Sequence, residues 1–252
     1  MVRVRAVFLD LDDTLVLTSK GDVRALEEVA QAASQHCPAV DPTKLLADWR
    51  QLFKEAPWDP THRVDVEEWR TGLWLQALQA QPSVVLEEAA ATAAALQRRF
   101  CTSRIEAFRF LPAVASMLGT LRSSCLTTVI ITNGHSDVQA SKLEACGARN
   151  LVDYVIIGGD EVAAGRYEKP HRSIYDRACQ LAGCTPDQAI MVGDNYICDV
   201  VGGQEAGLLA TVWINETGKA VPEGAAVMPT FTVSSVVELP ALIDQLNAGP
   251  PR

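Results

Sequence analysis

The sequence predicts an α/β protein, in which a Rossmann-like parallel sheet core carries an inserted all-helical domain. Two patterns along the 252 residues indicate this fold class. After residue 110, short β-branched runs alternate with segments of helical periodicity, which is typical of a parallel sheet covered by helices. Before that alternation, residues 23–104 show helical periodicity and no strand-like run, so a helical insert follows the first strand.

Six short apolar runs are the expected strands. They are residues 4–9, 127–132, 154–157, 189–192, 210–214 and 231–233. Almost every position in these runs is apolar, as expected of strands whose two faces are both buried. The expected sheet is therefore parallel, with helices on each side.

Helical segments fill most of the remaining chain. Those expected in the core are residues 113–122, 137–146, 172–181, 198–206 and 236–246, and those of the insert are 23–35, 42–54, 66–78 and 84–100. Breaks that contain proline separate the helices of the insert. We expect residues 1–16 and 108–252 to form the core domain and residues 17–107 to form the helical domain.

Composition limits the kinds of partner. The formal net charge of −9 argues against a nucleic-acid-binding protein, which usually carries a basic patch. No run approaches the ~20 apolar residues of a membrane-spanning helix, so no membrane partner is expected. The seven cysteines are odd in number and include no CxxC pair, which is typical of reduced thiols in a cytoplasmic protein. The sequence leaves the oligomeric state open.

Polar strings follow the expected strands of the core. They are Asp10-Leu11-Asp12-Asp13-Thr14, Thr132-Asn133-Gly134, Lys169-Pro170, and Gly193-Asp194 with Asp199. In open parallel sheets, ligands bind at the carboxyl ends of the strands. Each string alone is compatible with a turn, a helix cap or a solvated side chain. Four of them at one edge of one sheet indicate a functional site.

The first string offers two carboxyl groups to one pocket, because Asp10 and Asp12 lie two residues apart. An ionised carboxylate can attack phosphorus directly, and a second carboxyl can give a proton to the leaving alcohol. Crowding by a neighbouring acid raises the pKa of a carboxyl group and suits it to the second role. The spacing alone leaves open which of the two is the nucleophile.

A magnesium ion suits a site where an anionic carboxylate must meet an anionic phosphate. Mg²⁺ takes oxygen ligands from carboxylates, phosphate and water. Asp194 offers a further carboxylate to such an ion, and Asp199 can hold metal-bound water. Mg²⁺ is therefore the expected cofactor.

The remaining strings supply groups that bind phosphate. Lys169 offers a cation to the charge on a transferring phosphoryl group. The Thr132 hydroxyl and the Asn133 N–H can donate to phosphate oxygens, and Gly134 lets the backbone approach closely. The expected partner is a small-molecule phosphate ester.

Taken in chain order, these strings resemble the four motifs of the haloacid dehalogenase-like superfamily of phosphatases. The resemblance implies that Asp10 is the nucleophile and Asp12 the general acid and base of an aspartyl-phosphate mechanism. It implies magnesium ligands in Asp10, the backbone carbonyl of Asp12, and Asp194. The phosphate-binding residues that it implies are Thr132, Asn133 and Lys169. It also implies that the helical domain is a cap that closes over the active site.

Further strings resemble a branch of this superfamily that acts on a phosphorylated sugar acid. They comprise residues 4–8, 70–71 with 74, 142–146, 210–215 and 233–240. A substrate of that class carries a carboxylate, and arginine binds carboxylates through two parallel hydrogen bonds. Arg70 and Arg104 of the helical domain are therefore the candidate substrate-binding residues.

Other interpretations stay open at this point. Phosphoglycolate or another sugar phosphate would undergo the same chemistry. A phosphosugar mutase would form the same aspartyl-phosphate and return the phosphoryl group. A dehalogenase is disfavoured because it would not need Asp12 and Asp194, and a non-enzymatic binding protein is disfavoured because no catalytic position is missing.

Overall fold

The computed structural model describes residues 4–56, 63–82 and 86–248. The chain divides into two compact units: a core unit, Met1–Leu17 with Arg109–Arg252, and a helical unit, Thr18–Phe108. None of the helices in the described ranges combines the length and the apolar character that a membrane span requires.

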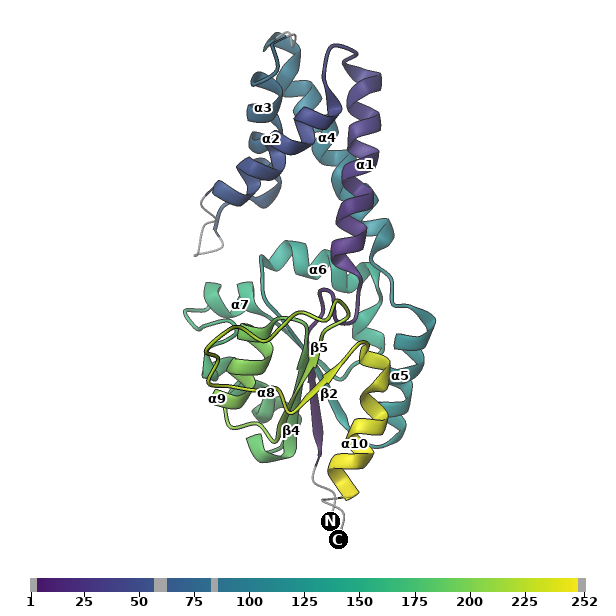
Figure 1. Ribbon diagram of the computed structural model, residues 1–252, viewed down its shortest axis with the longest axis vertical. Coiled ribbons are helices and arrows are strands. Elements are labelled where there is room, and N and C mark those ends of the chain that lie inside the picture. Colours follow the sequence, from purple (N-terminus) through teal and green to yellow (C-terminus); the bar gives the residue numbers. More distant parts are fainter. Residues whose placement is uncertain (1–3, 57–62, 83–85, 249–252) are drawn as a thin grey trace. The chain divides into compact units, whose positions relative to one another are not determined.

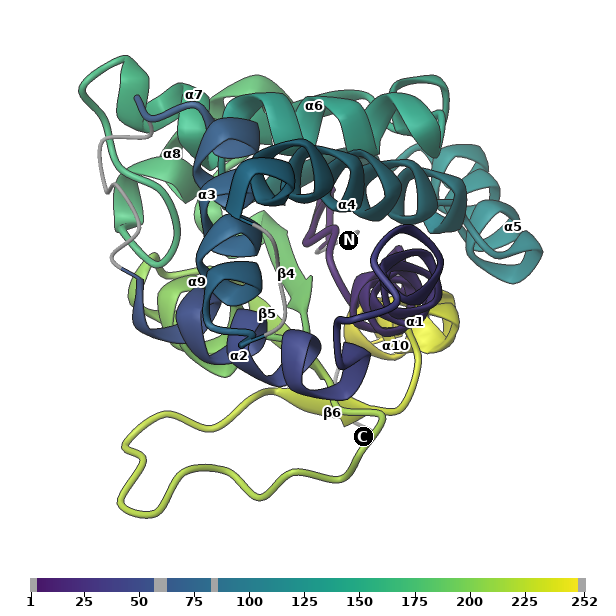
Figure 2. The same cartoon turned by 90° about the horizontal axis from the view of Figure 1, so that it is seen from above.

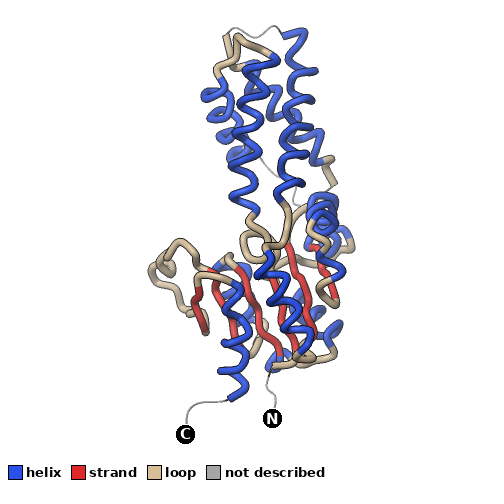
Figure 3. Tube along the Cα trace, turned by 90° about the vertical axis from the view of Figure 1, so that its right-hand side faces the viewer, coloured by secondary structure: helices blue, strands red, loops and turns tan. Residues whose placement is uncertain are grey.

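A six-stranded parallel sheet forms the centre of the core unit (Figure 1 and, from the side, Figure 3). Its strands are β1 Ala6–Leu9, β2 Thr127–Thr132, β3 Tyr154–Ile157, β4 Ala189–Gly193, β5 Ala210–Ile214 and β6 Phe231–Val233. They lie in the order β3-β2-β1-β4-β5-β6, and each neighbouring pair is parallel. This is the strand order of a doubly wound Rossmann-like sheet, so the predicted fold class is confirmed.

Helices cover both faces of this sheet. The helices of the core unit are α5 Pro112–Ser123, α6 Ser136–Ala145, α7 Gly158–Ala163, α8 Arg172–Ala182, α9 Gly202–Glu205 and α10 Leu239–Ala248. Short helical turns are η1 Ala148–Asn150, η2 Pro186–Gln188, η3 Tyr196–Val201 and η4 Val236–Glu238. Figure 1 shows α5 and α10 on one side of the sheet and α8 and α9 on the other.

The sheet core explains the apolar runs. Every residue of β1, β4 and β5 is buried, because helices pack on both faces. On the α8 face, Phe8, Val129 and Met191 pack with Ile174 and other buried side chains in one cluster. Removing such apolar surface from water stabilises the fold by roughly 25 cal/mol per Å².

Two local expectations were wrong. A single helix was expected over 198–206, but η3 is π-helical and is followed by the short α9. No helix was expected at 158–163, where α7 forms. Glycine pairs begin both α7 and α9, and glycine has low helix propensity, so tertiary packing determines the conformation of these segments.

After β5, a long loop extends away from the sheet before β6 (Figure 2).

The helical unit contains α1 Thr18–His36, α2 Pro42–Glu55, α3 Val66–Gln79 and α4 Leu86–Ala107. The expected start of the last helix, residue 84, lies outside the described residues. Asp41 and Asp65 cap α2 and α3 by accepting backbone N–H groups, as their type predicts. Trp49 stacks on Trp74 at 4.6 Å between ring centroids, so aromatic side chains hold the centre of this unit.

Candidate active site

The predicted polar strings meet at the carboxyl ends of the central strands. Asp10 and Asp12 follow β1, Thr132–Gly134 end and follow β2, and Asp194 follows β4. In the strand order, β2 and β4 flank β1, so the direction of winding reverses next to Asp10. Ligands of open α/β sheets bind at such a reversal.

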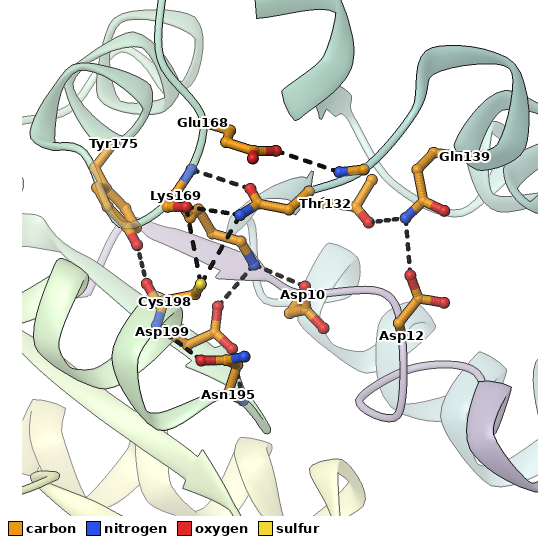
Figure 4. Close-up of polar contacts among 12 residues, drawn as sticks. Asp10, Asp12, Thr132, Gln139, Glu168, Lys169, Tyr175, Asn195, Cys198 and Asp199 are labelled. Atoms are coloured by element: carbon orange, nitrogen blue, oxygen red, sulfur yellow. Dashed lines mark hydrogen bonds and ion pairs between the residues drawn. The ribbon is translucent and has the colours of Figure 1, made fainter. Parts of the chain in front are cut away.

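Lys169 links two carboxylates at this edge (Figure 4). Its Nζ lies 2.7 Å from Asp10 Oδ1 and 2.7 Å from Asp199 Oδ1. All three side chains are buried. The structure therefore brings Lys169 together with Asp10, 159 positions away in the chain, and with Asp199, 30 positions away.

These charges shift one another's protonation. Burial raises the pKa of the Asp10 carboxyl to about 8, although the Lys169 charge opposes the shift. Burial lowers the pKa of Lys169, but the charges of Asp10 and Asp199 outweigh it and raise that pKa overall. Burial and the charge of Asp199 raise the pKa of Asp194 to about 6. Asp10, Asp194 and Asp199 therefore bring more acid to this cluster than the Lys169 ammonium group neutralises.

A divalent cation fits this excess of acid. Asp10, Asp194 and Asp199 form a carboxylate cluster in which one ligand atom from each lies within 4.8 Å of the others. When ionised, the three carboxylates exceed the charge of Lys169 by two negative charges. Oxygen ligands of this kind are those that Mg²⁺ prefers, so these residues fit the expected cofactor.

The segment after β4 is shaped around Asp199. A Cβ at Gly193 would lie 2.1 Å from Asp199 Oδ2, so a residue with a side chain does not fit there. The Asn195 N–H donates to Asp199 Oδ2 at 3.0 Å, and the Asn195 side chain accepts from the Cys198 N–H at 3.0 Å. The π-helical η3 places Asp199 beneath Lys169, and such turns often occur at functional sites.

The loop after β1 turns back on itself. Asp13 adopts a positive φ of 55°, and its N–H donates to Val16 O at 2.7 Å. The Leu15 and Val16 N–H groups both donate to Leu11 O at 3.0 Å. These bonds fold residues 11–16 into a tight loop that carries Asp12.

Asp12 contacts α6. Lys142 Nζ lies 2.7 Å from Asp12 Oδ1. Gln139 Nε2 donates to Asp12 Oδ2 at 2.8 Å (Figure 4). In the sequence, the neighbouring acid is the one feature that indicates a special environment for the Asp12 carboxyl. The structure adds a buried cation and a buried amide on this carboxylate.

The strand β2 ends at the predicted phosphate-binding string. Thr132 Oγ1 accepts a hydrogen bond from Gln139 Nε2. The Asn133 side chain pairs with the Lys169 backbone, with Oδ1 accepting at 3.0 Å and Nδ2 donating to the carbonyl at 2.7 Å. This pairing directs the Asn133 side-chain amide toward the Lys169 loop. The Asn133 backbone N–H is therefore the group suited to donate to a phosphate oxygen.

Gly134 has a φ of 116°, which glycine adopts far more readily than residues with a Cβ. Its N–H donates to Glu168 Oε2 at 3.3 Å. Glu168 therefore lies against the predicted phosphate-binding string, next to Lys169 in the chain.

Arg70 and Arg104 lie in the helical unit, and both are buried. Arg104 makes a two-point ion pair with Asp22, with Nη2 and Oδ2 3.2 Å apart, and lies 5.0 Å from the Phe100 ring centroid. Arg70 Nη1 lies 3.7 Å from Glu67 Oε1, and its Nε has no hydrogen-bond partner among the described residues. Burial and the charge of Arg104 lower the pKa of Arg70.

Four contacting residues were missed by the sequence argument: Gln139, Lys142, Glu168 and Asn195. Gln139 and Lys142 could have been found, because they lie three residues apart on the helix that follows the Thr132 string and so share one face. Glu168 and Asn195 lie beside residues that had been selected. Their contacts depend on loop conformation, which no spacing rule predicts.

The chain is similar to known proteins over most of its length. The family described as haloacid dehalogenase-like hydrolase matches residues 4–207. The chain is 33% identical over 245 residues to N-acylneuraminate-9-phosphatase of Homo sapiens, covering 97% of this chain and 96% of that protein. It is 29% identical to a phosphoserine phosphatase of Thermus thermophilus, covering 94% of this chain and 98% of that protein.

The solved structure of the Bacillus subtilis HAD-hydrolase YfnB, bound to magnesium, matches the fold. The TM-score is 0.67 at 19% identity, and the match covers 96% of this chain and 99% of that one. A family match over most of the chain and a 33% identical relative over nearly its full length establish the relationship. The chain belongs to the haloacid dehalogenase-like hydrolases, as an enzyme of the phosphatase type.

Proposed function

We propose that this chain is a magnesium-dependent phosphomonoesterase that hydrolyses N-acylneuraminate 9-phosphate through an aspartyl-phosphate. Such an activity would belong to sialic acid biosynthesis in the cytoplasm. The observation that carries the chemistry is the buried contact of Lys169 with both Asp10 and Asp199, beside Asp194. Similarity to N-acylneuraminate-9-phosphatase over 97% of the chain supports the substrate.

The proposed reaction has two steps. In the first, an Asp10 carboxylate oxygen attacks phosphorus, the bond from phosphorus to the ester oxygen breaks, and Asp12 gives that oxygen a proton. In the second, water attacks the phosphorus of the aspartyl-phosphate, Asp12 takes the proton, and Asp10 leaves as a carboxylate. Asp12 thereby returns to its starting state.

Each remaining side chain has a task in this scheme. Lys169 stabilises the charge on the transferring phosphoryl group, and the Thr132 hydroxyl and Asn133 N–H donate to its oxygens. Asp10, the Asp12 carbonyl and Asp194 would hold Mg²⁺, with Asp199 binding its water. The ion supplies positive charge that lets an anionic nucleophile approach an anionic phosphate.

Substrate selection is assigned to the helical unit, which we propose to act as the cap, residues 17–107. Arg70 is buried, and its Nε has no partner among the described residues. Arginine binds a carboxylate through two parallel hydrogen bonds, and a sialic acid ester carries one. Arg104 already meets Asp22, so its proposed part is to add positive charge beside Arg70.

The test is phosphate release from N-acetylneuraminate 9-phosphate beside phosphoglycolate, phosphoserine and glucose 1-phosphate. Each ester is assayed with Mg²⁺, with a chelator, with Asp10→Asn, and with Asp244→Asn, an exposed aspartate on α10, as the matched control. We expect the sialic acid ester to be preferred and its hydrolysis to be lost with the chelator and with Asp10→Asn alone.

Other outcomes are informative. Preference for another ester would keep the mechanism and discard this substrate. Conversion of a sugar phosphate to an isomer without phosphate release would indicate a mutase. Release that survives Asp10→Asn would overturn the nucleophile assignment.

A further inference from the structure

Two side chains of α6 contact the proposed proton donor without a task in the mechanism above. Lys142 Nζ lies 2.7 Å from Asp12 Oδ1, and Gln139 Nε2 donates to Asp12 Oδ2 at 2.8 Å. Gln139 is 1% exposed and Lys142 is 5% exposed. Burying an ammonium and an amide is unfavourable unless each meets a partner, so the pair is organised around this carboxylate.

Gln139 also reaches the phosphate-binding string, because its Nε2 donates to Thr132 Oγ1 (Figure 4). A carboxylate only accepts hydrogen bonds, so the amide nitrogen must face Asp12. That nitrogen carries two hydrogens, one for each partner. Since Thr132 Oγ1 accepts from Gln139, its own hydrogen is left to donate, as binding to a phosphate oxygen requires.

The position of α6 makes these contacts possible. The helix begins at Ser136, two residues after Gly134, so its first turns follow the phosphate-binding string directly. Gln139 and Lys142 lie three residues apart and share one face of the helix. One rigid element thus holds the proton donor and the phosphate-binding hydroxyl together.

We propose that Gln139 and Lys142 are positioning residues that hold Asp12 for proton transfer to the leaving group and tie it to Thr132. The inference rests on the proposed phosphatase function. It deepens that function, because it states which part of the reaction the two residues serve. A fixed donor matters when the leaving oxygen needs a proton, and matters little when it departs as a stable anion.

Leaving-group dependence therefore tests the proposal. The ratio kcat/KM reports the steps through departure of the alcohol, so the later attack of water does not enter. We would compare the best alkyl ester of the substrate panel with p-nitrophenyl phosphate, whose leaving group is a stable anion. Lys142→Met should lower kcat/KM about 10- to 100-fold for the alkyl ester and less than about 3-fold for the aryl ester.

Companion variants separate positioning from folding. Lys142→Arg should restore most of the alkyl activity, because it returns a cation to Asp12. Gln139→Leu should lower alkyl activity and also raise KM for both esters, because it also frees Thr132. Glu144→Gln, on the same helix and exposed, is the matched control and should change neither ester.

A double-mutant cycle closes the test. In an Asp12→Asn background, Lys142→Met should change the alkyl kcat/KM less than about 2-fold, because its partner is already lost. For Lys142→Met, equal losses on both esters, or additive losses in the cycle, would overturn the positioning role in an active enzyme. A wild-type protein that hydrolyses neither ester with Mg²⁺ would overturn the proposed function as well.

Discussion

Two buried lysines of the core unit and the buried Arg70 of the helical unit are paired in different ways. In the core unit, Lys142 and Lys169 each lie 2.7 Å from a carboxylate oxygen. In the helical unit, Arg70 Nη1 lies 3.7 Å from Glu67 Oε1, and the Arg70 Nε has no hydrogen-bond partner among the described residues. The sheet edge is thus organised before substrate arrives, whereas Arg70 keeps capacity for a further anion.

We infer from this contrast that buried charges have two different roles in this protein. A closely paired cation fixes the geometry of reacting groups, which catalysis requires in advance. A weakly paired buried cation lowers stability unless a ligand supplies the missing charge. Replacing Lys169 in the core unit should therefore lower stability. Replacing Arg70 in the helical unit should lower activity and leave stability equal or higher.

The largest stability effect is expected at the sheet edge. Lys169→Met would leave the Asp199 carboxylate, and Asp10 to the extent that it is ionised, buried without a cation, which typically destabilises a protein by about 3–5 kcal/mol. Urea denaturation at pH 7 without magnesium measures the loss. A loss below about 1 kcal/mol would show that these carboxylates do not depend on Lys169.

The second effect separates activity from stability. Arg70→Met replaces a weakly paired buried cation with an apolar side chain of similar length, so stability should stay equal or rise. A lost charge-assisted hydrogen bond of about 1.5–3 kcal/mol should lower kcat/KM for a carboxylate-bearing ester roughly 10- to 150-fold. Activity on p-nitrophenyl phosphate, which has no carboxylate, should not change. A parallel loss on both esters would contradict substrate recognition by Arg70.

The third effect concerns pH and magnesium. The pKa values of Asp10 and Asp194 are raised to about 8 and about 6, so the protonated carboxyls are favoured in the fold. Without metal, their contribution to stability falls as pH rises from about 4 through 8. A cation binds the ionised forms, so magnesium should raise Tm at least about 2 °C more at pH 8 than at pH 5.5.

Differential scanning fluorimetry of the wild type and of Asp194→Asn checks this prediction. The variant lacks one carboxylate of the cluster and should show a smaller magnesium response at pH 8. A response that is equal at both pH values would remove these carboxylates from the metal site.

The smallest effect is expected on the surface of the helical unit. Lys44 pairs with Asp48 one turn away on α2, and both side chains are partly exposed. Exposed pairs of this kind contribute about 0.3–0.5 kcal/mol, so Lys44→Met should change stability by no more than about 0.5 kcal/mol. Urea denaturation of this variant beside Lys169→Met provides the comparison, and similar losses would show that burial does not govern the difference.

The strands and the edge they share were predictable. Buried parallel strands read as continuous apolar runs, and β2, β3, β5 and β6 have the expected limits. Asp10 and Asp194 directly follow such runs, so a parallel sheet must bring them to one edge. The helix α7, which begins with a glycine pair, was not predictable, because packing overrides the low helix propensity of glycine.

The sequence by itself determined the fold class, the edge at which the polar groups gather and the kind of chemistry they support. Only the tertiary structure decided which groups pair: Lys169 with Asp10 and Asp199, and Asp12 with Gln139 and Lys142. The reason is physical. Strand periodicity fixes where a side chain leaves the sheet, whereas a pairing depends on the placement of a helix or loop from a distant part of the chain.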